Sequence, residues 1–378
     1  MKNNNKSKVV IIRGGFLNPW EMQNFEPLKD EFNITVISSL KPLNGNINLP
    51  LVKLASPIDI PNFPYKTQIL NRLFVDGQWL IGLEEQLKDV DIVHVAETYF
   101  AYTHQAIVAK RKGLVKKVIS TCWETIPHNN EGIWGRKKWK QQAYKEIDHF
   151  ICPTKRAKQS LIDEGCDHKK ISVIRMGVNL TNFKYQISNA NKNCINILFI
   201  GRLEKEKGIW ELLKAFQKLS LRYKNIKLNL IGSGKENNNL EDFVTVKKLT
   251  NKVSFLGNIG YNQIPKYLKN ADFFVLPSKN TKTWQEQYGM VLVEAMASGL
   301  AIISTSSGAI LEVIDGAGIL VSSGNESELL LAIESLINKE DLRKSLSLKS
   351  IKRAREEFDC NKSANKIGKI YREILKNR

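Results

Sequence analysis

The sequence has few cysteines and no long apolar run. Its 378 residues include five cysteines, an odd number that is scattered along the chain, so neither a disulfide framework nor a cysteine metal site is expected. No apolar segment is long enough to span a bilayer, and the early run Val9–Ile12 is too short for a signal peptide. We therefore expect a cytoplasmic protein with reduced thiols.

Two common nucleotide-binding motifs are also missing. No G-x-G-x-x-G follows the first predicted strand, and G-x-x-x-x-G-K-[ST] occurs nowhere in the chain. These absences disfavour nicotinamide-dependent dehydrogenases and P-loop proteins, whose phosphate-binding loops need those glycines.

Acidic residues are scarce relative to basic ones, and the formal net charge is +19. Residues 1–190 contribute 27 − 18 = +9 and residues 191–378 contribute 30 − 20 = +10. Such charge favours an anionic partner, which could be nucleic acid, a membrane surface or a phosphorylated substrate. Because the charge is spread evenly, no single basic domain or tail is indicated.

Two basic clusters stand out, at residues 110–117 and 136–140. Trp134, Trp139 and Tyr144 flank the second cluster at roughly helical spacing. This pattern is typical of a helix that lies in the membrane interface, although solvated surface is the simpler interpretation of each cluster alone.

Short apolar runs alternate with helical patterns along the whole chain. This alternation predicts parallel α/β sheets, and the length favours two domains. We place the first at residues 1–185 and the second at 190–357, because the polar, asparagine-rich stretch from Ile174 to about Asn193 is typical of a linker. The predicted strands are 9–12, 34–38, 92–95, 117–121, 150–152, 195–200, 228–231, 253–256, 273–276 and 301–304, and the predicted helices include 79–87, 101–112, 209–219 and 290–296.

Ligands of such sheets collect at the carboxyl ends of the strands. In the first domain this edge would hold Gly14, Gly15, Glu97 and the segment that contains Glu124 and His128. His128 lies in a loop after a strand, where it could bind a sugar hydroxyl or have no role, whereas His94 lies inside a strand and reads as structural.

The corresponding edge of the second domain is rich in glycine and serine. Arg202 and Lys207 follow the first strand on either side of a turn, so they can converge on one diphosphate. Gly232 and Asn258 follow the next two strands. A solvated lysine-rich loop is the alternative interpretation, which suits Lys205 better than Arg202.

The chain is organised around the segment Glu286–Gly299. It reads as a loop followed by a helix that begins near Tyr288 or Gly289, with Met290 and Val291 in the first turn. Helix N-termini attract anions, and a glycine there permits close approach of a phosphate. Glu294 lies within an apolar run, where an unpaired carboxylate is costly, so we expect it to face a ligand cleft.

Five motifs together resemble the retaining glycosyltransferases of family 4, which have the GT-B fold. They are Gly201-Arg-Leu-Glu-Lys-Glu-Lys-Gly208, Leu230-Ile-Gly-Ser-Gly234, Val253-Ser-Phe-Leu-Gly257, Ala271-Asp-Phe-Phe-Val-Leu-Pro-Ser278 and Glu286-x7-Glu294-Ala-Met-Ala-Ser-Gly299. The resemblance is dense from about Ile195 to Val321 and looser before that. It implies two doubly wound Rossmann-like domains facing each other across a cleft.

The resemblance further implies transfer of a hexose from a UDP- or GDP-sugar to an acceptor hydroxyl, with retention and without a metal or cofactor. Arg202, Lys207 and the helix start at Tyr288–Val291 would bind the diphosphate, Glu286 the sugar and Glu294 the ribose. Gly14, Gly15, Gly232, Gly289 and Asn258 would line the donor site. Among these residues, Glu286, Arg202 and Lys207 would be catalytic together with His128.

Family members carry a last helix that crosses back to the first domain, which residues 358–378 would supply. The first domain would bind the acceptor in glycolipid, cell-surface polysaccharide or glycan synthesis. A lipid-linked acceptor would place the protein at the inner face of the plasma membrane, contacted through residues 134–145.

Two other classes stay open at this stage. A nucleotide-sugar epimerase of the same shape would bind the donor but transfer nothing, and the paired glutamates argue against it. A nucleic-acid-binding protein would explain the charge, but the even charge distribution and the lack of a binding motif disfavour it.

Overall fold

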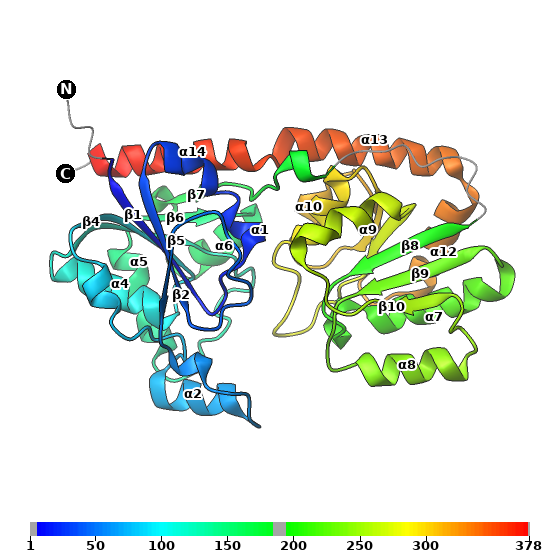
Figure 1. Ribbon diagram of the computed structural model, residues 1–378, viewed down its shortest axis with the longest axis horizontal. Helices are drawn as coiled ribbons and strands as arrows, with labels where there is room; N and C mark the ends of the chain where they lie inside the picture. Colours follow the sequence, from blue (N-terminus) through cyan, green and yellow to red (C-terminus); the bar gives the residue numbers. More distant parts are fainter. Residues whose placement is uncertain (1–5, 184–193, 377–378) are drawn as a thin grey trace. The chain divides into compact units, whose positions relative to one another are not determined.

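The computed structural model describes residues 6–183 and 194–376 (Figure 1). The chain forms two compact units, of which unit 1 combines Met1–Gly177 with Cys360–Arg378 and unit 2 is Val178–Asp359. The sequence placed the boundary between 185 and 190, largely outside the described residues, and the return at 358. In the structure the chain passes from unit 1 to unit 2 at Gly177 and returns after Asp359.

Unit 1 is built on a seven-stranded parallel sheet with the order β3-β2-β1-β4-β5-β6-β7. Most strands are continuous apolar runs, as expected where helices cover both faces of a parallel sheet. Their bounds are β1 Lys8–Gly14, β2 Asn33–Ser39, β3 Leu51–Leu54, β4 Val90–Ala96, β5 Val115–Thr121, β6 His149–Cys152 and β7 Ile171–Val173.

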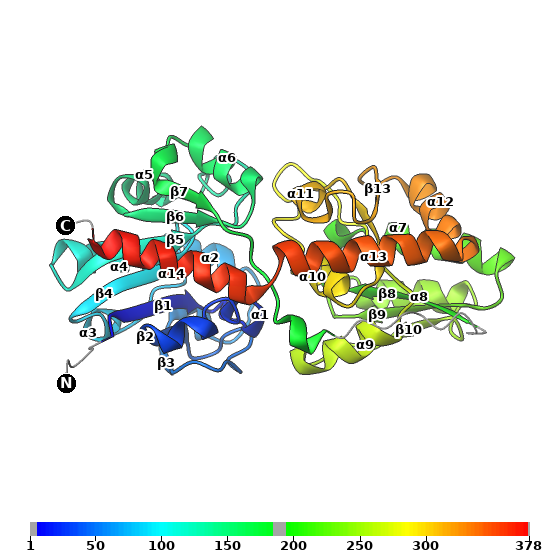
Figure 2. The ribbon, with the colours of Figure 1, turned by 90° about the horizontal axis from the view of Figure 1, so that it is seen from above.

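Helices cover both faces of this sheet. Alternate residues of β4 show the two sides, because Val93 and Val95 share a buried cluster with Tyr102 while His94 bonds Tyr371 of the last helix. Figure 2 shows that last helix running along unit 1. The helices are α1 Pro19–Met22, α2 Lys66–Phe74, α3 Leu83–Gln86, α4 Ala101–Arg111, α5 Arg136–Glu146, α6 Lys155–Asp163 and α14 Cys360–Lys376.

Unit 2 repeats the design with a six-stranded sheet of order β10-β9-β8-β11-β12-β13, also parallel. Its strands are β8 Ile195–Ile200, β9 Ile226–Ile231, β10 Val253–Phe255, β11 Phe273–Leu276, β12 Ala301–Thr305 and β13 Ile319–Val321. Its helices are α7 Ile209–Arg222, α8 Asn237–Val246, α9 Ile264–Asn270, α10 Met290–Ala297, α11 Ile310–Ile314, α12 Glu326–Asn338 and α13 Glu340–Glu357. The predicted fold class, two doubly wound Rossmann-like domains, is confirmed.

Some predicted elements were wrong or missing. The helix expected at 79–87 is only the four-residue α3, because Gly82 has a left-handed backbone (φ 77°) immediately before it. Three short strands, β3, β7 and β13, were not predicted.

The five cysteines are free thiols, and four of them are buried. Within the described ranges, no helix has both the length and the apolar character needed to cross a bilayer.

Candidate functional site

The strand order of unit 2 reverses between β8 and β11, and the loops after these two strands meet. The backbone N–H of Lys279 donates to the carbonyl of Glu206 at 2.7 Å. Gly208 permits this approach, because it has φ +69° and a Cβ there would lie 1.9 Å from the carbonyl oxygen of Pro277. Reversal points of this kind are where open α/β sheets bind ligands.

Lys207 and Glu286 form an ion pair across these two loops. The Nζ of Lys207 lies 2.7 Å from Oε2 of Glu286, and both side chains are largely buried. The hydroxyl of Ser278 donates to the same oxygen at 2.8 Å. The structure therefore brings together two residues that lie 79 positions apart and that the sequence assigned to one site.

Trp284 adds a contact that sequence reasoning missed. The Lys207 ammonium lies 4.9 Å from the centroid of its indole ring, a cation–π distance. The sequence feature that could have indicated this contact is an aromatic residue two positions before Glu286.

Arg202 lies at the end of β8 with its guanidinium in solvent. Its side chain is 59% exposed and forms an ion pair with Glu206 at 3.2 Å. Because a guanidinium has five N–H donors, this exposed side chain retains capacity to bind an anion.

Helix α10 begins at Met290, one residue after the expected start. Gly289 precedes it with φ 80° and ψ 57°, and Tyr288 packs edge-on against Phe358. Met290 and Val291 are partly accessible at the first turn, whereas the rest of the helix is buried. The accessible part of α10 is therefore its first turn, and the preceding Gly289 lies beside Glu286.

Glu294 is buried inside α10 rather than open to solvent, with 5% of its surface exposed. Burial raises the pKa of this carboxyl to about 8, and a hydrogen bond with Tyr261 counters part of that effect. Among the described residues no cation is paired with it. At neutral pH the protonated form is favoured, so this group can donate as well as accept a hydrogen bond.

Gly232 and Asn258 lie at the ends of the next two strands. A Cβ on Gly232 would lie 2.0 Å from the carbonyl oxygen of Gly201, so this glycine is required for two loops to pack together. Asn258 bonds the Ser233 hydroxyl at 3.0 Å. The packing of these loops therefore requires glycine at position 232 whether or not a ligand binds there.

In unit 1 the Arg13–Gly15 segment lies at the corresponding carboxyl edge of the sheet, but other side chains of the protein contact it. Gly15 donates its N–H to Oε1 of Gln78 at 2.8 Å, and a Cβ on Gly14 would lie 2.5 Å from the same oxygen. Arg13 is almost fully buried and pairs with Glu21 at 2.8 Å.

Glu97 and Glu124 lie at the ends of β4 and β5. Burial, and to a smaller extent the charge of Glu124, raise the pKa of Glu97 to about 8, although the N–H of Trp123 opposes part of this shift. Glu124 accepts from the backbone of Thr125 and Ile126 at 2.9 Å. His94, in contrast, is a satisfied structural histidine, since its ring nitrogens contact Tyr371 and Thr121.

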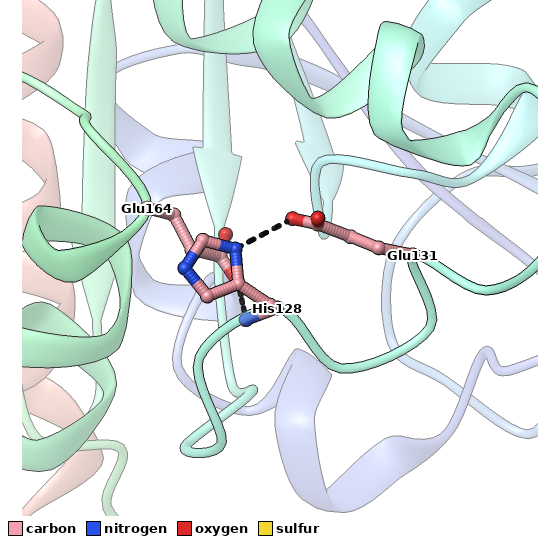
Figure 3. A group of neighbouring side chains, drawn as sticks. All are labelled: His128, Glu131 and Glu164. Atoms are coloured by element: carbon pink, nitrogen blue, oxygen red, sulfur yellow. Dashed lines mark hydrogen bonds and ion pairs between the residues drawn. The ribbon is translucent and has the colours of Figure 1, made fainter.

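His128 lies beside two glutamates, as Figure 3 shows. Its Nδ1 is 3.1 Å from Oε1 of Glu131, its backbone N–H donates to Glu164 at 2.7 Å, and its side chain is 59% exposed. One ligand atom from each of the three residues lies within 4.8 Å of the others.

This cluster is better explained as an ion network than as a metal site. The ammonium of Lys140 lies 2.6 Å from Glu164 and 3.3 Å from Glu131, and the Tyr144 hydroxyl donates to Glu164. Although burial alone would raise the pKa of Glu131, the bonds from His128 and Lys140 hold it below its ordinary value. The carboxylates therefore already have a cation.

The same network buries part of segment 134–145, which the sequence assigned to a membrane interface. Arg136, Lys140 and Tyr144 are buried inside unit 1, and Trp139 stacks on His104 with ring centroids 4.7 Å apart. One face of α5 packs against the rest of unit 1, so most of its basic and aromatic side chains contact other residues of the domain.

Each sheet thus has the strand order of a Rossmann-like domain, and unit 2 carries a Lys–Glu pair at the reversal point of its sheet. Such a pair of domains defines the GT-B class of two-domain proteins.

Comparison with known proteins gives the family. Residues 38–182 match the family model described as Glycosyltransferase Family 4, and residues 181–353 match Glycosyl transferases group 1. An uncharacterized glycosyltransferase of Methanocaldococcus jannaschii is 30% identical over 320 residues, which is 83% of this chain and 85% of that protein. The chain therefore belongs to glycosyltransferase family 4, as the sequence motifs implied.

Two further relatives are similar to the chain. The capsular polysaccharide biosynthesis glycosyltransferase CapM of Staphylococcus aureus is 30% identical over 191 residues, covering 47% of this chain and 46% of CapM. The crystal structure of Anabaena HepE in complex with UDP and glucose matches with a TM-score of 0.77 and 18% identity, covering 97% of this chain and 100% of that one. The structural match shows that the two chains share the GT-B fold.

Proposed function

We propose that the protein transfers a hexose from a nucleoside diphosphate sugar to an acceptor hydroxyl, with retention at the anomeric carbon and without a metal. The observation that carries this proposal is the Lys207–Glu286 pair at the reversal point of the unit 2 sheet. The pair places an ammonium and a carboxylate at hydrogen-bonding distance from each other. The ammonium is suited to the diphosphate of a nucleotide-sugar, and the carboxylate is suited to its sugar hydroxyls.

The leaving diphosphate would be neutralised by protein cations. Arg202 is exposed and paired at 3.2 Å with Glu206, an ion pair that it would exchange for the diphosphate, and Lys207 is held at the junction of the two loops. The N–H groups at the start of α10 would add donors to the same oxygens. This arrangement supplies the charge that a divalent ion would otherwise provide.

The two glutamates would bind hydroxyl groups. Glu286 accepts from Lys207 and Ser278 through one oxygen, Oε2, which leaves Oε1 to accept from a sugar hydroxyl. Glu294, protonated at neutral pH, would bond the ribose hydroxyls. The departing phosphate oxygen would act as base toward an acceptor that attacks from the same face, and His128 of unit 1 would contact the donor sugar.

The proposed donor is a UDP- or GDP-sugar. A solved structure of similar fold, Anabaena HepE, is in complex with UDP-glucose, which supports testing UDP-sugars first. We assign the acceptor to glycolipid, surface polysaccharide or glycan synthesis, with the protein cytoplasmic and peripheral at the inner face of the plasma membrane.

A donor panel tests the proposal. Thermal shift and donor hydrolysis would be measured with UDP-, GDP-, ADP- and dTDP-sugars in EDTA, for the wild type, Glu294→Ala and the exposed control Glu241→Ala on α8. We expect one donor to stabilise the wild type and the control without metal, and to stabilise Glu294→Ala less. If no donor changes the melting temperature of the wild type, the assignment of the unit 2 site is wrong.

A further inference from the structure

Aromatic rings and a buried carboxyl gather at the carboxyl edge of the unit 1 sheet. The strand order of this sheet reverses between β1 and β4. Phe16 follows β1, Phe100 follows β4, and their rings stack with centroids 5.2 Å apart and an angle of 26° between their planes. Parallel sheets bind ligands at such a reversal point. The stack therefore occupies in unit 1 the topological position that the Lys207–Glu286 pair occupies in unit 2.

The row of rings continues through Tyr99. Its ring centroid lies 4.9 Å from that of Phe100, and the guanidinium of Arg136 lies 5.1 Å from the Tyr99 ring. Tyr99 and Phe100 are half-buried, whereas Phe16, at the outer end of the row, is 45% exposed. Because Phe16 is held by the stack and is still accessible, it presents a flat apolar surface at this edge of the sheet.

Glu97, directly after β4, has a strained backbone that its neighbours enforce. Its φ of 57° lies in the left-handed region, which residues other than glycine rarely adopt. Its N–H donates to the carbonyl of Thr121 at 2.9 Å, and its carbonyl accepts from the hydroxyls of Thr103 at 3.1 Å and Ser120 at 3.0 Å. Strain that the surroundings enforce in this way is concentrated at binding and catalytic sites.

The side chain of Glu97 is buried with one of its oxygens unused. Glu97 is 6% exposed, and its Oε1 accepts the N–H of Trp123 at 2.8 Å. In the described part of the chain, neither Oε2 of Glu97 nor the hydroxyl of Tyr99 has a hydrogen-bond partner. Burial, with the charges of Glu97 and Glu124, raises the pKa of the Tyr99 phenol well above its ordinary value. A carboxyl and a phenol are therefore both available to bond a ligand.

The chemistry of this group selects among ligands. Glu124 adds a carboxylate, while Arg136 and Lys140 are already paired with Asp76 and Glu164 at 3.4 and 2.6 Å, so an anionic phosphate is disfavoured. An alkyl chain would cover the unused carboxyl oxygen and phenol without bonding them, which is costly. A sugar ring suits both features, because its C–H face packs on an aromatic ring and its hydroxyls bond the polar groups.

We propose that the acceptor is itself a saccharide, whose terminal ring packs on Phe16 and bonds Glu97 and Tyr99. The inference rests on the proposed transfer function and names the chemical class of the acceptor. A hydroxyl oxygen of that ring forms the new bond to the anomeric carbon, the bond from this carbon to the phosphate oxygen breaks, and the hydroxyl proton leaves with the phosphate. Glu97 and Tyr99 determine which acceptor binds and take no part in the bond exchange.

Saturation-transfer NMR of the full chain without donor tests the acceptor class. The methyl glycosides of glucose, galactose, mannose and N-acetylglucosamine would be compared with hexanol and glycerol phosphate. We expect at least one glycoside to bind, and neither hexanol nor glycerol phosphate. Phe16→Ala should lower the affinity for that glycoside about tenfold, and Phe16→Trp should retain it because a ring is kept. Glu97→Met should also lose about tenfold, and Glu97→Gln should retain binding because its amide still bonds a hydroxyl.

The matched control is Phe63→Ala, which removes another exposed phenylalanine of unit 1, 41% exposed, and should leave glycoside binding unchanged. Thermal melts would show that the variants are folded. Donor-induced thermal shifts should be equal in all of them, so that a failure of the acceptor assignment is distinguished from a failure of the donor site. The proposal would be overturned if Phe16→Ala bound the glycoside as tightly as the wild type. Binding of hexanol or glycerol phosphate but of no methyl glycoside, or of no probe at all, would overturn it equally.

Discussion

Both units place an arginine at the carboxyl end of the first strand of the sheet, and the two arginines have opposite surroundings. Arg13 ends β1 with 1% of its surface exposed, whereas the side chain of Arg202 after β8 is 59% exposed. The first six strands of the unit 1 sheet have the same order as the six strands of unit 2, so β1 and β8 are topologically equivalent. The residue type at a strand end therefore does not decide its role.

The difference comes from what the following segment supplies. After β1 the chain returns through α1 and provides Glu21 as a partner, while the ring of Phe25 lies 5.4 Å from the Arg13 guanidinium. The guanidinium also donates to the carbonyls of Ile12 and His94. After β8 the ion-pair partner of Arg202 is the partly exposed Glu206. Arg13 is thus part of the structure of unit 1, and Arg202 is available to a ligand.

The largest expected effect is on Arg13. Arg13→Met would leave Glu21 buried without its cation, and we expect a loss of about 3–5 kcal/mol in the free energy of unfolding. Urea unfolding of the full chain, followed by circular dichroism, would measure it. Arg202→Met is the matched variant: it should unfold like the wild type and instead lower sugar transfer about hundredfold. Similar stability losses in both variants would show that the contrast between the two arginines is false.

The second comparison concerns two buried carboxyls, Glu97 in unit 1 and Glu294 in unit 2. The pKa of each is raised to about 8, in both cases mainly by burial. In the unfolded chain a glutamate titrates near its ordinary value, so between the two pKa values the native state binds more protons than the unfolded state. Stability therefore falls as pH rises through this window.

Replacing either glutamate by glutamine removes its contribution to the fall in stability with rising pH. We expect each variant to gain about 2–3 kcal/mol relative to the wild type between about pH 5.5 and 7.5, measured by urea unfolding at a series of pH values. The variant Glu124→Gln distinguishes the two glutamates, because the charge of Glu124 raises the pKa of Glu97 but does not act on Glu294. If Glu124→Gln left the Glu97 contribution unchanged, burial alone would account for the raised pKa.

The sequence predicted the sheets better than the contacts. Continuous apolar runs marked most of the strands, while β3 was missed because Leu51–Leu54 is short and partly exposed. The predicted topology placed Lys207 and Glu286 at the same edge of the sheet. It did not predict their ion pair, because strand order brings loops together but does not determine which side chains interact.

The sequence likewise did not show which residues of helix α5 are buried. Helical spacing located a basic and aromatic face, but not whether that face is buried, and Arg136, Lys140 and Tyr144 lie inside the domain. Their partners Asp76 and Glu164 are on other elements, far along the chain. Helix α2 was missed because its apolar residues remain exposed instead of marking a core face.

The smallest expected effect concerns the aromatic rings beside the two cations. Trp284 lies against Lys207 and Phe25 against Arg13, at 4.9 and 5.4 Å. Because Lys207 lies at the proposed diphosphate site, Trp284→Leu should raise the KM for the donor about two- to fivefold, the value of a cation–π contact of about 0.5–1 kcal/mol. The kcat should change little, and Trp284→Phe should restore most of the affinity because it keeps a ring.

Phe25→Leu is the counterpart in unit 1. It should lower the free energy of unfolding and leave the KM unchanged, since Arg13 contacts no ligand in our assignment. Steady-state kinetics and urea unfolding on the three variants would separate these outcomes. A rise in KM that is equal for Trp284→Leu and Trp284→Phe would mean that the size of the indole, rather than its π face, positions Lys207.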